Sequence, residues 1–207
     1  MNSATRPGGQ DDQSGPGTLT AEESWGLARR LADGELDCCD AVMASLGSPP
    51  PVMIWNPPPD DMDSETLRHL VAWWQEVAAS AGGPPLPEAV DPLLLRPALG
   101  SVSLLDVVDG GRDFRIRLHG SIVSGTLGVD MTGMLVGEMA VPFMTFLIVT
   151  YRAQLLRPEP LLLRYTPAKE FFLSAWWRLG LPLARDAQVV RLLVGMERAP
   201  RQQASRG

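Results

Sequence analysis

Cysteine, histidine and aromatic residues are scarce in this chain of 207 residues. It has two cysteines and two histidines, and Phe, Trp and Tyr together make up 6% of it. Cys38 and Cys39 are adjacent, so a disulfide between them would be strained, and their spacing does not match that of zinc ligands. Only His69 and His119 could complete a metal site. The sequence therefore predicts no metal centre and two reduced, buried or half-buried thiols.

An excess of positive charge and a long apolar run are missing as well. The formal net charge is −6, whereas binding to nucleic acid or to an anionic membrane surface needs basic patches. The longest apolar run, residues 139–151, contains Pro142 and is shorter than the roughly 20 residues that span a bilayer. The first residues show no secretory leader pattern. We therefore expect a cytoplasmic protein with no nucleic-acid and no membrane partner.

Hydrophobic residues are abundant, at 45% of the chain, which is enough for one domain with a core and a smaller segment. Threonine and glutamate at Thr20 and Glu23 form a capping-box motif that predicts a helix start. Six prolines within residues 49–59 exclude a regular helix there. The predicted division is a disordered tail over 1–17, a short helical segment over 18–48, a proline-rich connector over 49–62, the main domain with its flanking helix over 63–197 and a tail over 198–207.

Turn residues separate two apolar-patterned runs within residues 101–120. In the second run, Phe114, Ile116 and Leu118 alternate with polar side chains, which is the period of a half-buried strand. The Asp109–Arg112 turn contains two glycines, which tolerate the positive φ angles of a tight chain reversal. This segment predicts a β-hairpin, with His119 on the face opposite to the three apolar side chains.

Helical and extended patterns surround this hairpin. Before it, apolar side chains between residues 67 and 78 recur at helical spacing and form a broad face that includes Trp73 and Trp74. After it, the pattern predicts short helices over 121–136, a long helix over 142–156, and strands over 161–165, 170–183 and 188–197.

Six short motifs follow the same order along the chain. They are Leu86-Pro87, Asp91-Pro92, Leu104-Leu105-Asp106-Val107, Phe114-Arg115-Ile116-Arg117-Leu118 with Gly120, Gly128 to Gly133, and Leu181-Pro182-Leu183. With the order of the elements, they resemble a bacterial single-domain subfamily of the PAS domain family, over about residues 66–197. The chain departs from that pattern at His119, where the family has a small or apolar residue, and at Ser121, where it has threonine.

The resemblance implies an α+β fold, with a five-stranded antiparallel sheet, helices on one face, and here an N-terminal helical extension. PAS domains sense small molecules, light or redox state, or mediate dimerisation. The implied pocket for a small apolar ligand would be lined by Phe114, Ile116, Leu118 and Phe146. Because His119 is expected to face away from this pocket, no haem is expected. A light-responsive flavin sensor would need a cysteine inside the domain, and both cysteines lie outside it, so this argument leaves open only flavin that is bound without a covalent bond. The expectation is that the chain has no cofactor.

Aromatic side chains on the outer face of the sheet predict an interface. Trp176 and Trp177 are adjacent on a strand and must point to opposite faces; Trp177 is expected outside. The helix that carries Trp73 and Trp74 is a suitable cover for this face, in the same chain or from a second subunit. The sequence therefore predicts a homodimer and an unknown signalling partner.

The predicted function is a cytoplasmic PAS-like sensory or protein-interaction module that acts in trans in signalling, without catalytic activity. The alternative is a small-molecule enzyme or binding protein on a similar α+β cone fold. Such an enzyme would use a carboxylate whose pKa is raised by an apolar pocket. Asp106 and Glu138 are the nominal candidates for that role.

Overall fold

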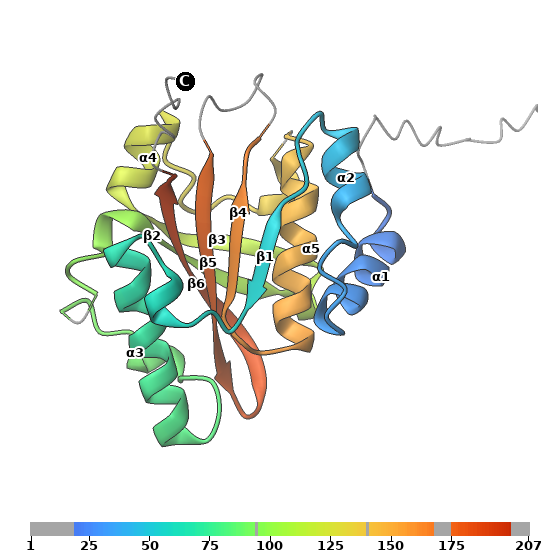
Figure 1. Ribbon diagram of the computed structural model, residues 1–207. Coiled ribbons are helices and arrows are strands. Elements are labelled where there is room, and N and C mark those ends of the chain that lie inside the picture. The colour runs from blue at the N-terminus through green and yellow to red at the C-terminus, as the bar shows by residue number, and fades with distance from the viewer. Residues whose placement is uncertain (1–18, 94, 140, 168–174, 200–207) are drawn as a thin grey trace, which may run out of the picture.

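A six-stranded antiparallel sheet forms the centre of the molecule, with helices on both of its faces (Figure 1). The computed structural model describes residues 19–93, 95–139, 141–167 and 175–199. The helices are α1 (Ala21–Ala32), α2 (Asp40–Ser45), α3 (Glu65–Ala81), α4 (Ser121–Leu127) and α5 (Phe143–Leu156). The strands are β1 (Val52–Trp55), β2 (Val102–Val108), β3 (Asp113–His119), β4 (Leu161–Tyr165), β5 (Trp176–Arg185) and β6 (Gln188–Arg198).

The strand order is β1-β4-β5-β6-β2-β3, and every neighbouring pair is antiparallel. From β2 onward, the chain forms two strands, short helices, the long helix α5 and three strands, as the PAS resemblance implies. The α+β, PAS-like architecture is thus confirmed. The predicted start of the β5 strand, and both predicted tails apart from residues 198 and 199, lie outside the described residues.

The expected number of five strands is wrong, because the proline-rich connector contains a sixth. Residues Val52–Trp55 pair with β4, from Val52 opposite Arg164 to Trp55 opposite Leu161. The prolines lie on either side of this short run, and β1 is an edge strand, where a missing backbone N–H is tolerated. The two groups of prolines therefore mark the two ends of β1 and lie outside its paired residues.

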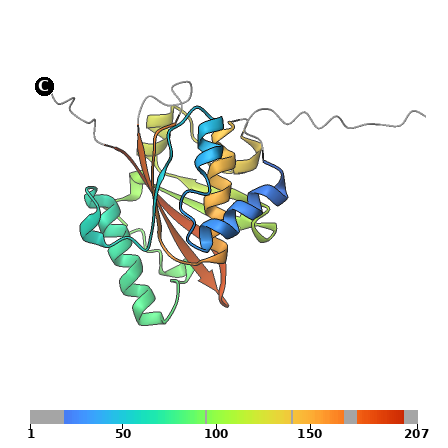
Figure 2. The same ribbon diagram turned by 45° about the vertical axis from the view of Figure 1, so that its right-hand side comes forward.

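The expectation of helices on one face is also wrong. Figure 2 shows α3 on one side of the sheet and α1, α2 and α5 on the other. The reason lies in the central strands, which are apolar on both faces. On β5, Trp176 belongs to the core under α5, whereas its neighbour Trp177 belongs to a second core under α3. Two apolar faces need two covering layers.

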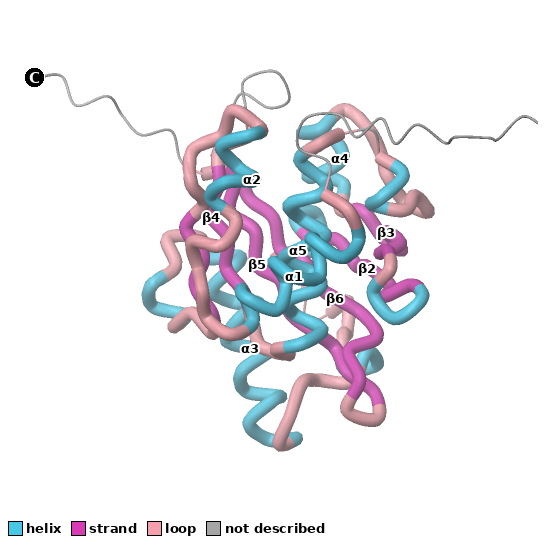
Figure 3. The backbone as a smooth tube through the Cα atoms, turned by 90° about the vertical axis from the view of Figure 1, so that its right-hand side faces the viewer, coloured by secondary structure: helices cyan, strands magenta, loops and turns pink. Residues whose placement is uncertain are grey.

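The N-terminal helical segment is part of the first core. The capping box at Thr20 is present, with the Thr20 side chain and Glu23 bonding each other's backbone N–H groups. Helix α1 lies beside α5 (Figure 3). The Arg152 guanidinium of α5 lies over the Trp25 ring at 4.9 Å and donates to the carbonyl oxygen of Gly111 at 2.9 Å. This contact ties α1, α5 and the β2–β3 turn together.

Candidate ligand-binding cavity

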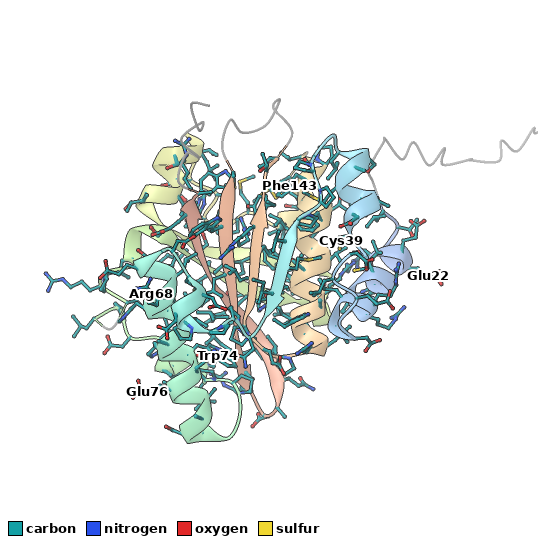
Figure 4. The ribbon with its side chains drawn as sticks, in the orientation of Figure 1. Glu22, Cys39, Arg68, Trp74, Glu76 and Phe143 are labelled. Carbon is teal, nitrogen blue, oxygen red and sulfur yellow. The ribbon has the colours of Figure 1, made fainter. Side chains whose placement is uncertain are left out.

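A partly open cavity of about 50 Å³ lies between α5 and the inner face of the sheet. Phe143, at the start of α5, marks one of its walls (Figure 4). The lining is mainly apolar and draws on α5, α4, all strands except β1, and the segment that follows α4. Four of its side chains are methionines, Met131, Met139, Met144 and Met196. The volume has room for a few water-sized groups.

A bulge in β3 decides which side chains reach this cavity. Leu104 of β2 pairs with Leu118, but the next residue, Leu105, pairs with Ile116, so one extra residue, Arg117, is inserted in β3. An extra residue reverses the facing of every later side chain on that strand. The prediction that His119 faces away from the pocket is therefore wrong. Its side chain is 3% exposed and lines the cavity.

The same bulge separates the four residues predicted for the pocket. Ile116 lies before it and lines the cavity. Leu118 lies after it, is 44% exposed, and cannot be part of the lining. Phe114 and Phe146 are fully buried in the same core, behind the lining, and the Phe114 ring packs edge-on against the ring of Tyr151 at 5.1 Å.

An arginine, Arg178, is the most unusual member of the lining. It lies on β5 two residues after Trp176, so both point to the inner face, and it is 8% exposed. One terminal nitrogen donates to the Tyr151 hydroxyl, and the other lies 3.3 Å from the sulfur of Met196, a weak acceptor. Its Nε is buried without a hydrogen-bond partner. No carboxylate among the described residues forms an ion pair with it.

Tyr151 is held in its neutral form by this environment. Burial raises the pKa of its hydroxyl, and the nearby Arg178 charge opposes that shift without cancelling it. Since the Tyr151 oxygen accepts a hydrogen bond from Arg178, its own hydrogen is left for another acceptor. The sequence pattern could have indicated Arg178 but not its partner, because Arg178 interrupts an otherwise apolar strand on its core-facing side.

His119 is neutral as well. Burial lowers the pKa of its imidazole and Arg178 adds to that effect, while Asp130, whose carboxylate oxygen is 3.9 Å from Nδ1, opposes it. The backbone N–H of Met131 donates to Nδ1 at 3.1 Å, which places the single ring proton on Nε2. His119 is thus a hydrogen-bond donor at the cavity. The cavity volume of about 50 Å³ is smaller than a porphyrin.

Two of the three residues predicted for an interface are covered by their own chain. Trp74 lies between α3 and the sheet (Figure 4), and its Nε1 donates to the carbonyl oxygen of Pro182 at 2.7 Å. Trp177 is buried in the same outer core, with the Arg164 guanidinium 5.1 Å from its ring. Trp73 is partly buried against that core. Helix α3 therefore covers this face in cis.

The acidic residues considered for catalysis lie away from the cavity lining. Asp106 forms ion pairs with Arg191 at 2.6 Å and with Arg117 at 3.0 Å. Partial burial alone would raise the pKa of its carboxyl, but the hydrogen bonds from the two arginines outweigh it and hold the pKa below its ordinary value. Glu138 is exposed. Neither carboxylate is therefore part of the apolar cavity in which such an enzyme would need it.

Cys38 and Cys39 are both buried and reduced, as predicted. Their sulfur atoms are 3.7 Å apart, and the hydrogen bond with the Cys38 thiol, together with burial, raises the pKa of Cys39. Within the described residues, no three His, Cys, Asp or Glu side chains gather into a possible metal site. In the same part of the chain, no helix combines the length and apolarity needed to cross a membrane.

The chain matches no protein-family model and no curated protein. Among solved structures, it is similar to the structure of an RNA-binding light-oxygen-voltage receptor, with 12% sequence identity and a TM-score of 0.37. The similarity covers 86% of this chain and 62% of that one, so the chain spans less than two thirds of the receptor's length. The case for a function therefore depends on the cavity.

Proposed function

We propose that this chain is a PAS-like sensory module that binds a small molecule in the cavity under α5 and signals to a partner in trans, without catalytic activity of its own. The cavity is the observation that carries the proposal. An apolar pocket with a few convergent polar groups is the usual form of a small-molecule site. Here the polar groups include Arg178, Tyr151 and His119.

The lining supports binding of a ligand somewhat larger than the present volume. Methionine has three rotatable bonds and a polarisable sulfur, so it repacks around different shapes at low cost. Four methionines contribute to this cavity. A ligand that displaces their side chains would fit without moving the sheet.

The segment after α4 is the proposed route from ligand to partner. It contributes Met131, Val136 and Met139 to the lining. It is also fastened to β3, because the Ile116 N–H donates to the carbonyl of Met134 at 3.0 Å and the Gly133 N–H donates to the carbonyl of Ile116 at 2.6 Å. Ligand binding would shift the population of arrangements of this segment, whose outer side is exposed to a partner.

The described lining favours binding over the alternative of catalysis on an α+β cone. A ketosteroid-isomerase type of mechanism needs a carboxylate in the apolar pocket. All the described polar lining residues are Ser, His, Tyr or Arg, and none is acidic. The homodimer stays a prediction. Of the three residues expected at its interface, Trp74 and Trp177 are buried within the chain, and Trp73 is partly exposed.

Methionine-methyl NMR under xenon pressure tests the cavity, because xenon enters apolar cavities in proteins. We expect shifts at Met131, Met139, Met144 and Met196, and none at Met43 and Met62, which are buried outside the lining. The same spectra would then be recorded with a set of small organic acids, amines and neutral compounds. At least one compound should shift the lining methyl signals.

Val136→Phe is the matching variant, since Val136 is buried and lines the cavity. It should abolish both xenon and compound binding by filling the space. Val129→Phe, at an exposed position in the same segment, is the control and should bind as the wild type does. The proposal is refuted if the wild type shows no xenon shift and binds none of the compounds.

A further inference from the structure

Arg178 has no counter-charge in the cavity from the part of the chain that the structure describes. Arg178 carries a fixed positive charge inside the fold, and burying a charge without a counter-charge is costly. Its partners among the described residues are the side chains of Tyr151 and Tyr165, the thioether sulfur of Met196 and the face of the Tyr151 ring at 5.9 Å, and its Nε–H has no acceptor. None of these contacts neutralises a guanidinium. No acidic side chain among the described residues supplies the negatively charged acceptor that Arg178 requires.

The other polar groups of the lining point to the same chemistry. The Tyr151 hydroxyl hydrogen is not used by Arg178, and the ring proton of His119 is on Nε2, away from its bond with Met131. Arg178, Tyr151 and His119 therefore all offer N–H or O–H donors at one cavity. Since no acidic residue is among the described lining residues, these donors suit an anion, and a guanidinium binds a carboxylate through two parallel bonds.

We propose that the ligand is a short-chain monocarboxylate, an inference that rests on the proposed function. Its carboxylate pairs with Arg178 and accepts from Tyr151, and its alkyl tail lies among the lining methionines. The small volume and the mainly apolar lining exclude a large or doubly charged acid. The expected ligand therefore has one charged end and a short apolar end.

The experiment compares butyrate with butyramide, a neutral analogue of nearly the same shape, by methionine-methyl NMR on the full chain. Butyrate should bind at least about 10-fold more tightly, since hydrogen bonds to a charged group are stronger than neutral ones. Acetate should bind more weakly than butyrate, by about fourfold for each methylene lost from the apolar tail. Nitrate, an anion without a tail, should bind more weakly than butyrate.

Arg178→Met should weaken butyrate binding about 10- to 100-fold while leaving xenon binding intact. Arg178→Lys keeps the charge but loses the paired geometry, and it should have an intermediate effect. A measurement on the unmodified chain avoids any folding defect of these variants. The Nε–H resonance of Arg178 should shift with butyrate and stay in place with butyramide.

The outcomes separate this inference from the proposed function. If butyramide binds as tightly as butyrate, or the Arg178 Nε–H signal does not respond to butyrate, the acid assignment is wrong while a sensing cavity stands. If nitrate binds as tightly as butyrate, the site is for an inorganic anion and the tail assignment is wrong. If xenon and all compounds fail to shift the lining methyl signals, both proposals fail.

Discussion

Replacing Trp74 by phenylalanine tests whether α3 is held on the sheet by contacts within the chain. The indole Nε1 donates to the Pro182 carbonyl at 2.7 Å in a buried setting. Phenylalanine keeps most of the apolar surface but leaves that carbonyl without its partner, which costs about 1–3 kcal/mol. For a chain of this size, a loss of about 2 kcal/mol lowers Tm by about 4–8 °C. We therefore expect Trp74→Phe to lower the free energy of unfolding of the chain by about 1–3 kcal/mol.

The assay is urea unfolding followed by far-UV circular dichroism, because the substitution removes a fluorophore. Trp73→Phe is the matched control, because Trp73 is one position away on the same helix and only partly buried. It should lower the free energy of unfolding by less than Trp74→Phe does. Both midpoints should be independent of protein concentration. A Trp74→Phe effect within about 0.5 kcal/mol, the range of neutral surface changes, would refute the intramolecular contact. A midpoint that rises with protein concentration would show that a second subunit contributes to stability.

Two further predictions follow from the β3 bulge. Ile116→Ala should destabilise the fold by about 2–5 kcal/mol, whereas Leu118→Ala, on the exposed side, should stay below about 1 kcal/mol; equal costs in urea unfolding would contradict the bulge. Burial lowers the pKa of the His119 imidazole below its ordinary value of 6.5. His119 therefore takes up a proton more readily in the unfolded chain than in the folded one. The free energy of unfolding should therefore fall as the pH drops below about 6.5. His119→Asn should flatten that fall, and an unchanged pH slope would count against a buried neutral imidazole.

Local signals were enough to predict most of the elements. The capping box at Thr20 needs only residues three apart, and the Asp109–Gly111 turn needs only residues that accept a positive φ, which Asp109, Gly110 and Gly111 all adopt. Helices α3 and α5 appear close to their expected ranges. These features depend on neighbours in the sequence, so tertiary contacts had little to add.

The cavity could be predicted only in part. Alternation correctly placed Ile116 on the inner face, but a bulge depends on how two strands align, and β3 shows no glycine or proline that would announce it. Arg178 and Tyr151 are 27 residues apart in the sequence and come from different elements. Their contact exists only because α5 crosses the inner face of β5.

The sequence by itself determined the order of the elements from the hairpin onward, because helix and strand periods, caps and turns are properties of short segments. The α+β class followed from the resemblance that this order carries. The tertiary structure alone decided the sixth strand, the cover of the outer face by α3 in cis, and the inward turn of His119. Those features depend on strand register and on which apolar faces meet, and both are settled only when distant segments pack together.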